Sequence, residues 1–229
     1  LGAGEGAFVA WGQYVHSPIV VVDSGEVTRA LVGDRQQLDL AGAAGVIDGV
    51  EVGAQLPVVF HQSTELPGEG LGSTASAGLG RLNVYGKASL MNNPGLRVAT
   101  ALDIGLPTTT ANAYLGAAGL SVSPSLVASA HAGPATVATE LGFIAQKHSE
   151  MFNISDANKV SYSVALMVDG PDKMTYQLEV FGHTSAGTPF ENPDESPLQV
   201  MGGGRGTLNE FLAVTWGLGT AISPGIGAP

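Results

Sequence analysis

An alternating stretch at residues 50–62 constrains the fold more than any other feature of the sequence. It reads VEVGAQLPVVFHQ. The even-numbered residues from Val50 to Phe60 are apolar, whereas most odd-numbered ones, such as Glu51 and Gln55, are polar or small. Successive side chains of a strand point to opposite faces, so the pattern predicts one strand with an apolar and a polar face. A tilted strand of roughly 9–11 residues crosses a bilayer, and this stretch is long enough to do so.

The composition is compatible with a membrane barrel and with one soluble alternative. Only 13% of the 229 residues are charged, about half the roughly 25% of soluble domains. Yet no apolar run reaches the roughly 18 residues of a membrane helix. Composition alone therefore leaves two classes open, a membrane β-barrel and a soluble β-sandwich rich in small residues.

Charge and cysteine content exclude other classes. The formal net charge of −11 argues against nucleic-acid binding, which requires a basic surface. The lack of cysteine excludes disulfides and thiolate metal sites. The first four residues, LGAG, do not form a signal peptide, as expected for a mature or trimmed start.

The same alternation recurs along the chain and predicts an antiparallel up-and-down β-barrel. The predicted strands cover residues 7–17, 35–46, 50–62, 77–91, 96–107, 118–131, 135–147, 160–168, 174–183, 198–205 and 211–222. Residues 18–33 are interpreted as a connection that holds extended ends of both neighbours, and residues 148–158 as a loop. Short turns near residues 48, 93, 133, 171 and 208 alternate with longer connections. Such alternation is typical of outer-membrane barrels. It is not expected of a sandwich.

Ionisable residues inside these strands fall on the polar parity, and none lies on the apolar parity until the strand ends. Because a charge on the lipid face at mid-membrane costs roughly 2–4 kcal/mol, this is expected of a barrel. A sandwich with one solvated face per sheet would show the same parity, but with more charge. We predict that these five acids and four bases face the lumen and pair there: Asp39, Glu51, Arg81, Lys87, Arg97, Asp103, Glu140, Glu179 and Arg205.

Three segments resemble a known family. They are residues 50–62 with the ending LPVVFHQ, residues 78–87 (GLGRLNVYGK) and residues 102–108 (LDIGLPT), preceded by Asp34-Arg35. Together they resemble the N-terminal transmembrane barrel of OmpA-family proteins of the myxobacterial type. The resemblance covers most of the chain.

The resemblance implies a single barrel domain over residues 1–229 in the bacterial outer membrane, with about twelve strands. Eleven are readable here, and a closing strand is expected beyond Pro229 because bacterial barrels have even strand numbers. The implied partners are outer-membrane lipid and lipopolysaccharide, an envelope protein assembly, and peptidoglycan through a C-terminal domain that this sequence lacks.

Candidate chemistry in the sequence is weak, and we predict no enzyme, cofactor or metal. Residues 183–185 (HTS) only partly match the His-x-Ser-Asn stretch of outer-membrane phospholipases. The glycines of residues 202–206 lack the Lys-Ser/Thr of a phosphate loop and are better explained by strand packing. The five histidines are scattered, and an acidic loop at residues 192–195 is more simply a solvated surface than a cation site.

Two functions remain open. One is a structural anchor or assembly component of the cell envelope, and the other is a passive channel for small solutes. About eight strands leave a filled interior and 16–18 leave an aqueous pore, so twelve lies between. Many polar-parity positions are small, which keeps room in the lumen: Gly53, Ala99, Ala101, Ser121, Ser123, Gly142, Ser161 and Gly203.

Overall fold

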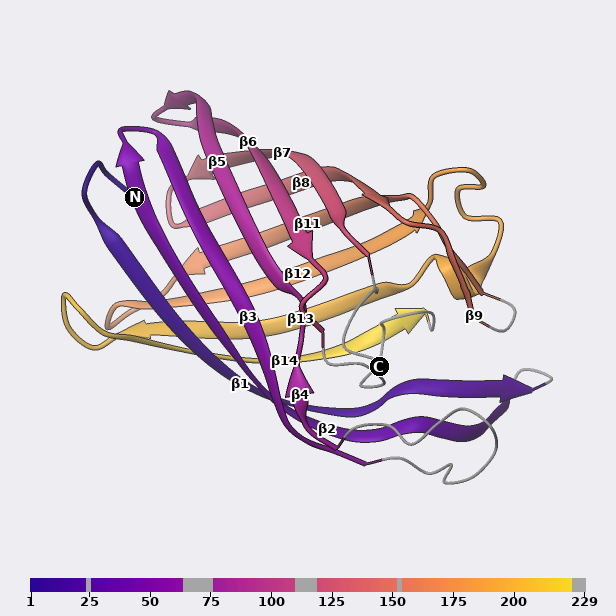
Figure 1. Ribbon diagram of the computed structural model, residues 1–229. Helices are drawn as coiled ribbons and strands as arrows, with labels where there is room; N and C mark the ends of the chain where they lie inside the picture. Colours follow the sequence, from indigo (N-terminus) through magenta and orange to yellow (C-terminus); the bar gives the residue numbers. More distant parts are fainter. Residues whose placement is uncertain (24–25, 64–75, 110–118, 152–153, 224–229) are drawn as a thin grey trace. The chain divides into compact units, whose positions relative to one another are not determined.

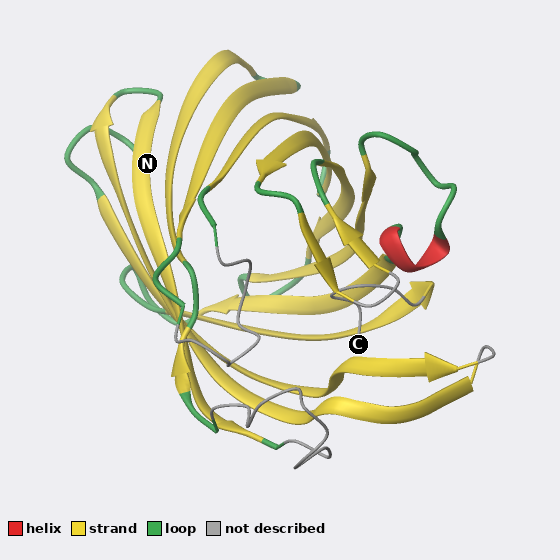
Figure 2. Ribbon diagram, turned by 45° about the vertical axis from the view of Figure 1, so that its right-hand side comes forward, coloured by secondary structure: helices red, strands yellow, loops and turns green. Residues whose placement is uncertain are grey.

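The computed structural model of residues 1–229 is built from β-strands (Figure 1). It describes residues 1–23, 26–63, 76–109, 119–151 and 154–223. The strands are β1 (Gly6–Asp23), β2 (Glu26–Ile47), β3 (Val50–Gln62), β4 (Gly78–Leu79), β5 (Leu82–Asn93), β6 (Leu96–Leu106), β7 (Ser121–Ala132), β8 (Ala135–Gln146), β9 (Ser149–Met151), β10 (Ile154–Asp156), β11 (Lys159–Asp169), β12 (Met174–Ser185), β13 (Leu198–Thr207) and β14 (Ala213–Ser223). Within these ranges the one helical element is a 3₁₀ turn, η1 (Pro193–Glu195), drawn red in Figure 2. No helix among them is long and apolar enough to span a membrane.

The strands follow one another in a single sheet. Its order is β1-β2-β3-β5-β6-β7-β8-β11-β12-β13-β14, with the two-residue β4 paired to β3 off this path. The strand pairs with a described register are all antiparallel. The path therefore holds the eleven strands predicted from the sequence, and the antiparallel up-and-down fold class is confirmed.

The chain forms two compact units, described separately below. Unit 1 comprises residues 1–87 and 102–122, and unit 2 comprises residues 88–101 and 123–228. The interpretation of residues 1–229 as one domain stays a prediction.

Glycine and other residues with a left-handed backbone conformation close the short turns. The β2–β3 turn lies at Asp48-Gly49, where Gly49 has φ +80°, and the β7–β8 turn uses Gly133 with φ +58°. Between β11 and β12, Asp172 and Lys173 both have positive φ, as a tight hairpin that follows the strand twist requires. The predicted alternation of short turns and longer connections is present from β2 to β14, whereas β1 and β2 pair as far as Asp23↔Glu26.

The apolar parity is the exposed face of the strands. In β3, Val52 and Phe60 are exposed, and in β12 Tyr176 and Leu178 are exposed. Other exposed residues of the predicted apolar parity are Val84, Leu90, Leu96, Leu102, Leu120, Leu126, Val137, Leu141, Phe143, Val164, Leu166, Val168, Leu212, Val214, Trp216 and Leu218. A soluble protein would bury these side chains, whereas a membrane barrel turns them towards lipid.

Two predicted boundaries differ from the structure. The strand expected at residues 77–91 is interrupted at Gly80-Arg81 and becomes β4 and β5. Gly80 N donates to Pro57 O at 2.8 Å, and a Cβ at Gly80 would lie 2.9 Å from Pro57 Cβ, so the backbone approaches β3 too closely for a regular side chain. The loop expected at residues 148–158 contains the short β9–β10 hairpin.

The β1–β2 hairpin is longer than the other hairpins. The two strands pair from Gly6↔Ala44 out to Asp23↔Glu26, so residues 18–33 hold extended ends, as interpreted from the sequence. The register shifts between His16 and Ile19, next to Ser17 with φ +48°. This irregularity is a β-bulge, which separates the inner part of the hairpin from its outer part.

Candidate functional site: the polar faces of the two units

A buried carboxylate lies at the centre of the polar face of unit 1. Asp39 on β2 is 7% exposed and accepts hydrogen bonds from the amides of three glutamines, one on β2 itself and one on each of its neighbours β1 and β3. Gln13 Nε2 lies 2.5 Å from Asp39 Oδ2, Gln37 Nε2 lies 3.0 Å from both oxygens, and Gln55 Nε2 lies 3.4 Å from Oδ1. The bases expected to pair with Asp39 are replaced by neutral amides, which satisfy the charge through hydrogen bonds.

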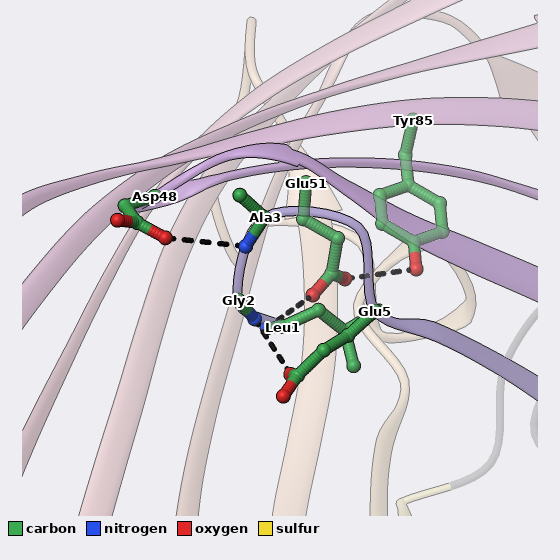
Figure 3. A network of polar contacts seen from close by, with 7 residues as sticks. All are labelled: Leu1, Gly2, Ala3, Glu5, Asp48, Glu51 and Tyr85. Carbon is green, nitrogen blue, oxygen red and sulfur yellow. Dashed lines mark hydrogen bonds and ion pairs between the residues drawn. The ribbon is translucent and has the colours of Figure 1, made fainter.

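A second cluster of polar contacts lies near the β2–β3 turn (Figure 3). Tyr85 Oη donates to Glu51 Oε1 at 3.1 Å, and the amino group of Leu1 lies 3.2 Å from Glu51 Oε2. The backbone N–H of Ala3 donates to Asp48 Oδ1 at 3.2 Å. The Tyr85 ring packs over Gly53, where a Cβ would lie 2.5 Å from ring atoms. The glycine therefore makes room for the tyrosine that holds Glu51, which also interacts electrostatically with Lys87.

Arg81 extends across β6 within unit 1. Its Nη1 donates to Ser121 Oγ at 2.6 Å and its Nη2 to Gly119 O at 3.5 Å. The side chain passes over Gly105, where a Cβ would lie 2.5 Å from Arg81 Cδ. Arg81 also interacts electrostatically with Asp103 on β6. One base thus joins the start of β5 to β6 and β7.

The polar face of unit 2 contains an open pocket of about 410 Å³. We call it the β8–β13 pocket because its lining comes from β8, β11, β12 and β13. The lining residues are Glu140, Ile144, Ser161, Tyr162, Ser163, Glu179, Phe181, Gly182, His183 and Gln199. Neither Glu140 nor Glu179 forms a hydrogen bond or ion pair with a described residue. The acids of this face are therefore free to interact with a solute.

The remaining predicted bases lie apart from these clusters. Arg97 on β6 and Arg205 on β13 are exposed and form no ion pair within the described ranges. The structure thus gathers some of the predicted charged residues into local clusters, without joining all nine in one pairing network. That they face a lumen stays a prediction.

Sequence reasoning missed the glutamines and the pocket. Gln37 lay on the polar parity of β2, but the faces of β1 were ambiguous, so the partner role of Gln13 was not found. In the structure Phe8, Val9 and Tyr14 are exposed while Gln13 faces Asp39, so the faces of β1 are distinguished only from Trp11 onward. Predicting the pocket would require the pairing register of four strands. The alternation within a single strand does not contain this information.

Two weak sequence motifs have structural roles. Thr184, in the HTS stretch, is buried, lies 2.9 Å from Ser196 Oγ and accepts a hydrogen bond from Phe190 N. Asn192 caps η1 by accepting from Asp194 N at 3.1 Å. Among the described residues no group of three or more His, Cys, Asp or Glu side chains could hold a metal ion.

The fold and the exposed apolar parity define an integral β-barrel protein of the bacterial outer membrane, the location predicted from the sequence. The chain is similar in structure to an outer-membrane channel from Pseudomonas putida F1, with a TM-score of 0.64 and 17% sequence identity. The similarity covers 97% of this chain and 90% of that one. No family model and no curated protein matches the sequence.

Proposed function

We propose that the protein is a passive channel for small solutes. The observation that carries this proposal is the β8–β13 pocket, an open hollow of about 410 Å³ that contains two carboxylates on the polar parity of unit 2. A barrel of about eight strands has an interior filled by side chains. Here the strands instead present small polar residues, such as Ser161 and Ser163, and two unengaged carboxylates.

The similar solved structure supports the same function. The protein from Pseudomonas putida F1 is described as an outer-membrane channel, and it shares this fold over nearly the whole chain. The channel proposal rests on the pocket, and the shared fold makes the proposal reasonable for a barrel of this size.

The second candidate is a structural anchor of the cell envelope. The resemblance of residues 50–62, 78–87 and 102–108 to OmpA-family barrels favours it. The partners would be outer-membrane lipid and lipopolysaccharide, an envelope assembly, and peptidoglycan through a further domain. The Asp39 cluster of unit 1, in which three amides hold one buried carboxylate, also suits a rigid anchor.

Single-channel recording in planar bilayers separates the two candidates. We expect discrete conductance steps from the purified, refolded protein. Ser163→Trp puts a large ring into the pocket and is expected to lower the conductance. Val164→Trp, at a 54% exposed position on the lipid-facing parity of the same strand, is the matched control and should leave the conductance unchanged. Correctly folded protein that inserts without conductance would favour the anchor.

A further inference from the structure

We propose that the β8–β13 pocket binds a small organic cation between Glu140 and Glu179. This inference rests on the proposed channel function and names the class of solute that the pocket would select. It follows from the charge of the pocket, the spacing of the two carboxylates and the residues around them.

The pocket has acidic side chains without compensating bases. None of its lining residues is a lysine or arginine, and His183 is the one lining residue that can carry a positive charge. Glu140 and Glu179 form no hydrogen bond or ion pair within the described part of the chain. In unit 1, by contrast, Asp39 and Glu51 have hydrogen-bond donors. Two unengaged carboxylates in one hollow create a negative potential that attracts cations.

The strand register sets the distance between the two acids. Glu140 on β8 is in register with Ser163 on β11, and Glu179 on β12 is in register with Ala165. One strand therefore separates them, with an offset of two residues. Strand spacing and rise give about 12 Å between their α-carbons. This span suits a cation of several atoms, since a single ion needs ligands at roughly 2–2.6 Å.

Apolar groups in the pocket also favour an organic cation. Phe181 on β12 and Ile144 on β8 line the same hollow as the acids. An aromatic ring attracts cations through its face and packs against alkyl groups, whereas a hydrated metal ion gains little from such neighbours. Gln199 and the serines supply hydrogen-bonding groups for a polar substituent.

Choline is a suitable probe because it combines a quaternary ammonium with a hydroxyl group. Its uncharged carbon isostere, dimethylbutanol, has the same shape without the charge. We expect isothermal titration calorimetry of the folded protein in detergent micelles to detect choline binding and no binding of dimethylbutanol. The double variant Glu140→Gln, Glu179→Gln should bind choline about tenfold more weakly.

The matched control is the double variant Glu191→Gln, Glu210→Gln. It removes the same formal charge from exposed positions outside the pocket and should bind choline like the wild type. Circular dichroism and heat-modified mobility on gels establish that all variants are folded. An equal loss of choline affinity in both double variants would show that only the net charge of the protein attracts choline. This result would overturn the proposed site.

Other outcomes separate this inference from the channel function. Conductance without choline binding would overturn the inference and leave the channel standing. Choline binding to a protein without conductance would support the site and overturn the channel. Displacement of choline by an equal concentration of sodium would contradict the preference for an organic cation.

Discussion

The polar faces of the two units differ in how their acids are held. In unit 1, Asp39 is buried against three glutamine amides and Glu51 accepts from Tyr85. In unit 2, Glu140 and Glu179 line an open pocket and have no partner in the described ranges. The exposed apolar parity is the same in both. One strand pattern thus supports two acids that accept hydrogen bonds in unit 1 and two acids that line an open pocket in unit 2.

The largest expected effect tests what the two units share. Leu56→Arg in unit 1 and Leu178→Arg in unit 2 each put a guanidinium on the apolar parity and should each cost roughly 2–4 kcal/mol. Gln55→Arg, on the polar parity beside Asp39, should cost less. Denaturant titration of folding into lipid vesicles measures the three free energies. Equal costs for Leu56→Arg and Gln55→Arg would contradict the assigned faces.

The next effect tests the difference between the polar faces directly. Asp39→Ala removes a buried acceptor from three amides and should lower the free energy of unfolding by about 1–3 kcal/mol. Glu179→Ala removes an acid without a partner and should change it by less than about 0.5 kcal/mol. The same vesicle titration compares the two. A similar loss of unfolding free energy at both positions would contradict the difference between the units.

A comparable effect is expected where glycine accommodates an aromatic ring. Gly53→Ala forces the Tyr85 ring to move from 2.5 Å and should cost about 1–3 kcal/mol. In unit 2 a Cβ at Gly204 would lie 3.1 Å from the Trp216 ring, so Gly204→Ala should cost less. Unfolding titrations of both variants, with Gly53→Ala repeated in a Tyr85→Ala background, check the assignment. A partial loss of the Gly53→Ala penalty in that background is expected, because the new Cβ would still lie 2.7 Å from the backbone oxygen of Gly42. An undiminished penalty would contradict the role of the tyrosine ring.

The smallest effect concerns one hydroxyl group. Tyr85→Phe removes the hydrogen bond to Glu51 and should cost about 0.5 kcal/mol. Tyr176→Phe, at an exposed position on β12 whose hydroxyl has no partner among the described residues, should cost nothing measurable. Paired unfolding curves in the same lipid measure both. A cost at Tyr176 as large as that at Tyr85 would show that the hydroxyl acts through the bilayer interface.

The strands were predictable because the sequence pattern that specifies each strand lies within the strand and its turns. Residues 50–62 are β3 as predicted, since the alternation and the Asp-Gly turn define both faces and one end. The break at Gly80 was not predictable, because it depends on the approach of Pro57 from β3.

The predicted sites likewise divide into features that depend on one strand and features that depend on its neighbours. Parity placed Asp39, Glu140 and Glu179 among the polar positions, but it contained no information on neighbours across strands. Whether an acid meets three amides or an open pocket depends on register, which a single sequence specifies only through its turns.

The length of the β1–β2 hairpin has a consequence for which parts of the chain tolerate change. At about 3.3 Å per residue, the 22 residues of β2 extend about 70 Å, whereas the hydrocarbon core is about 30 Å thick. The bulge beside Ser17 ends the regular register before the outer part of this ribbon begins. Substitutions beyond the bulge can therefore be accommodated without disturbing the strands that cross the bilayer. The outer ribbon is a place where sequence variation and insertion are compatible with an intact protein.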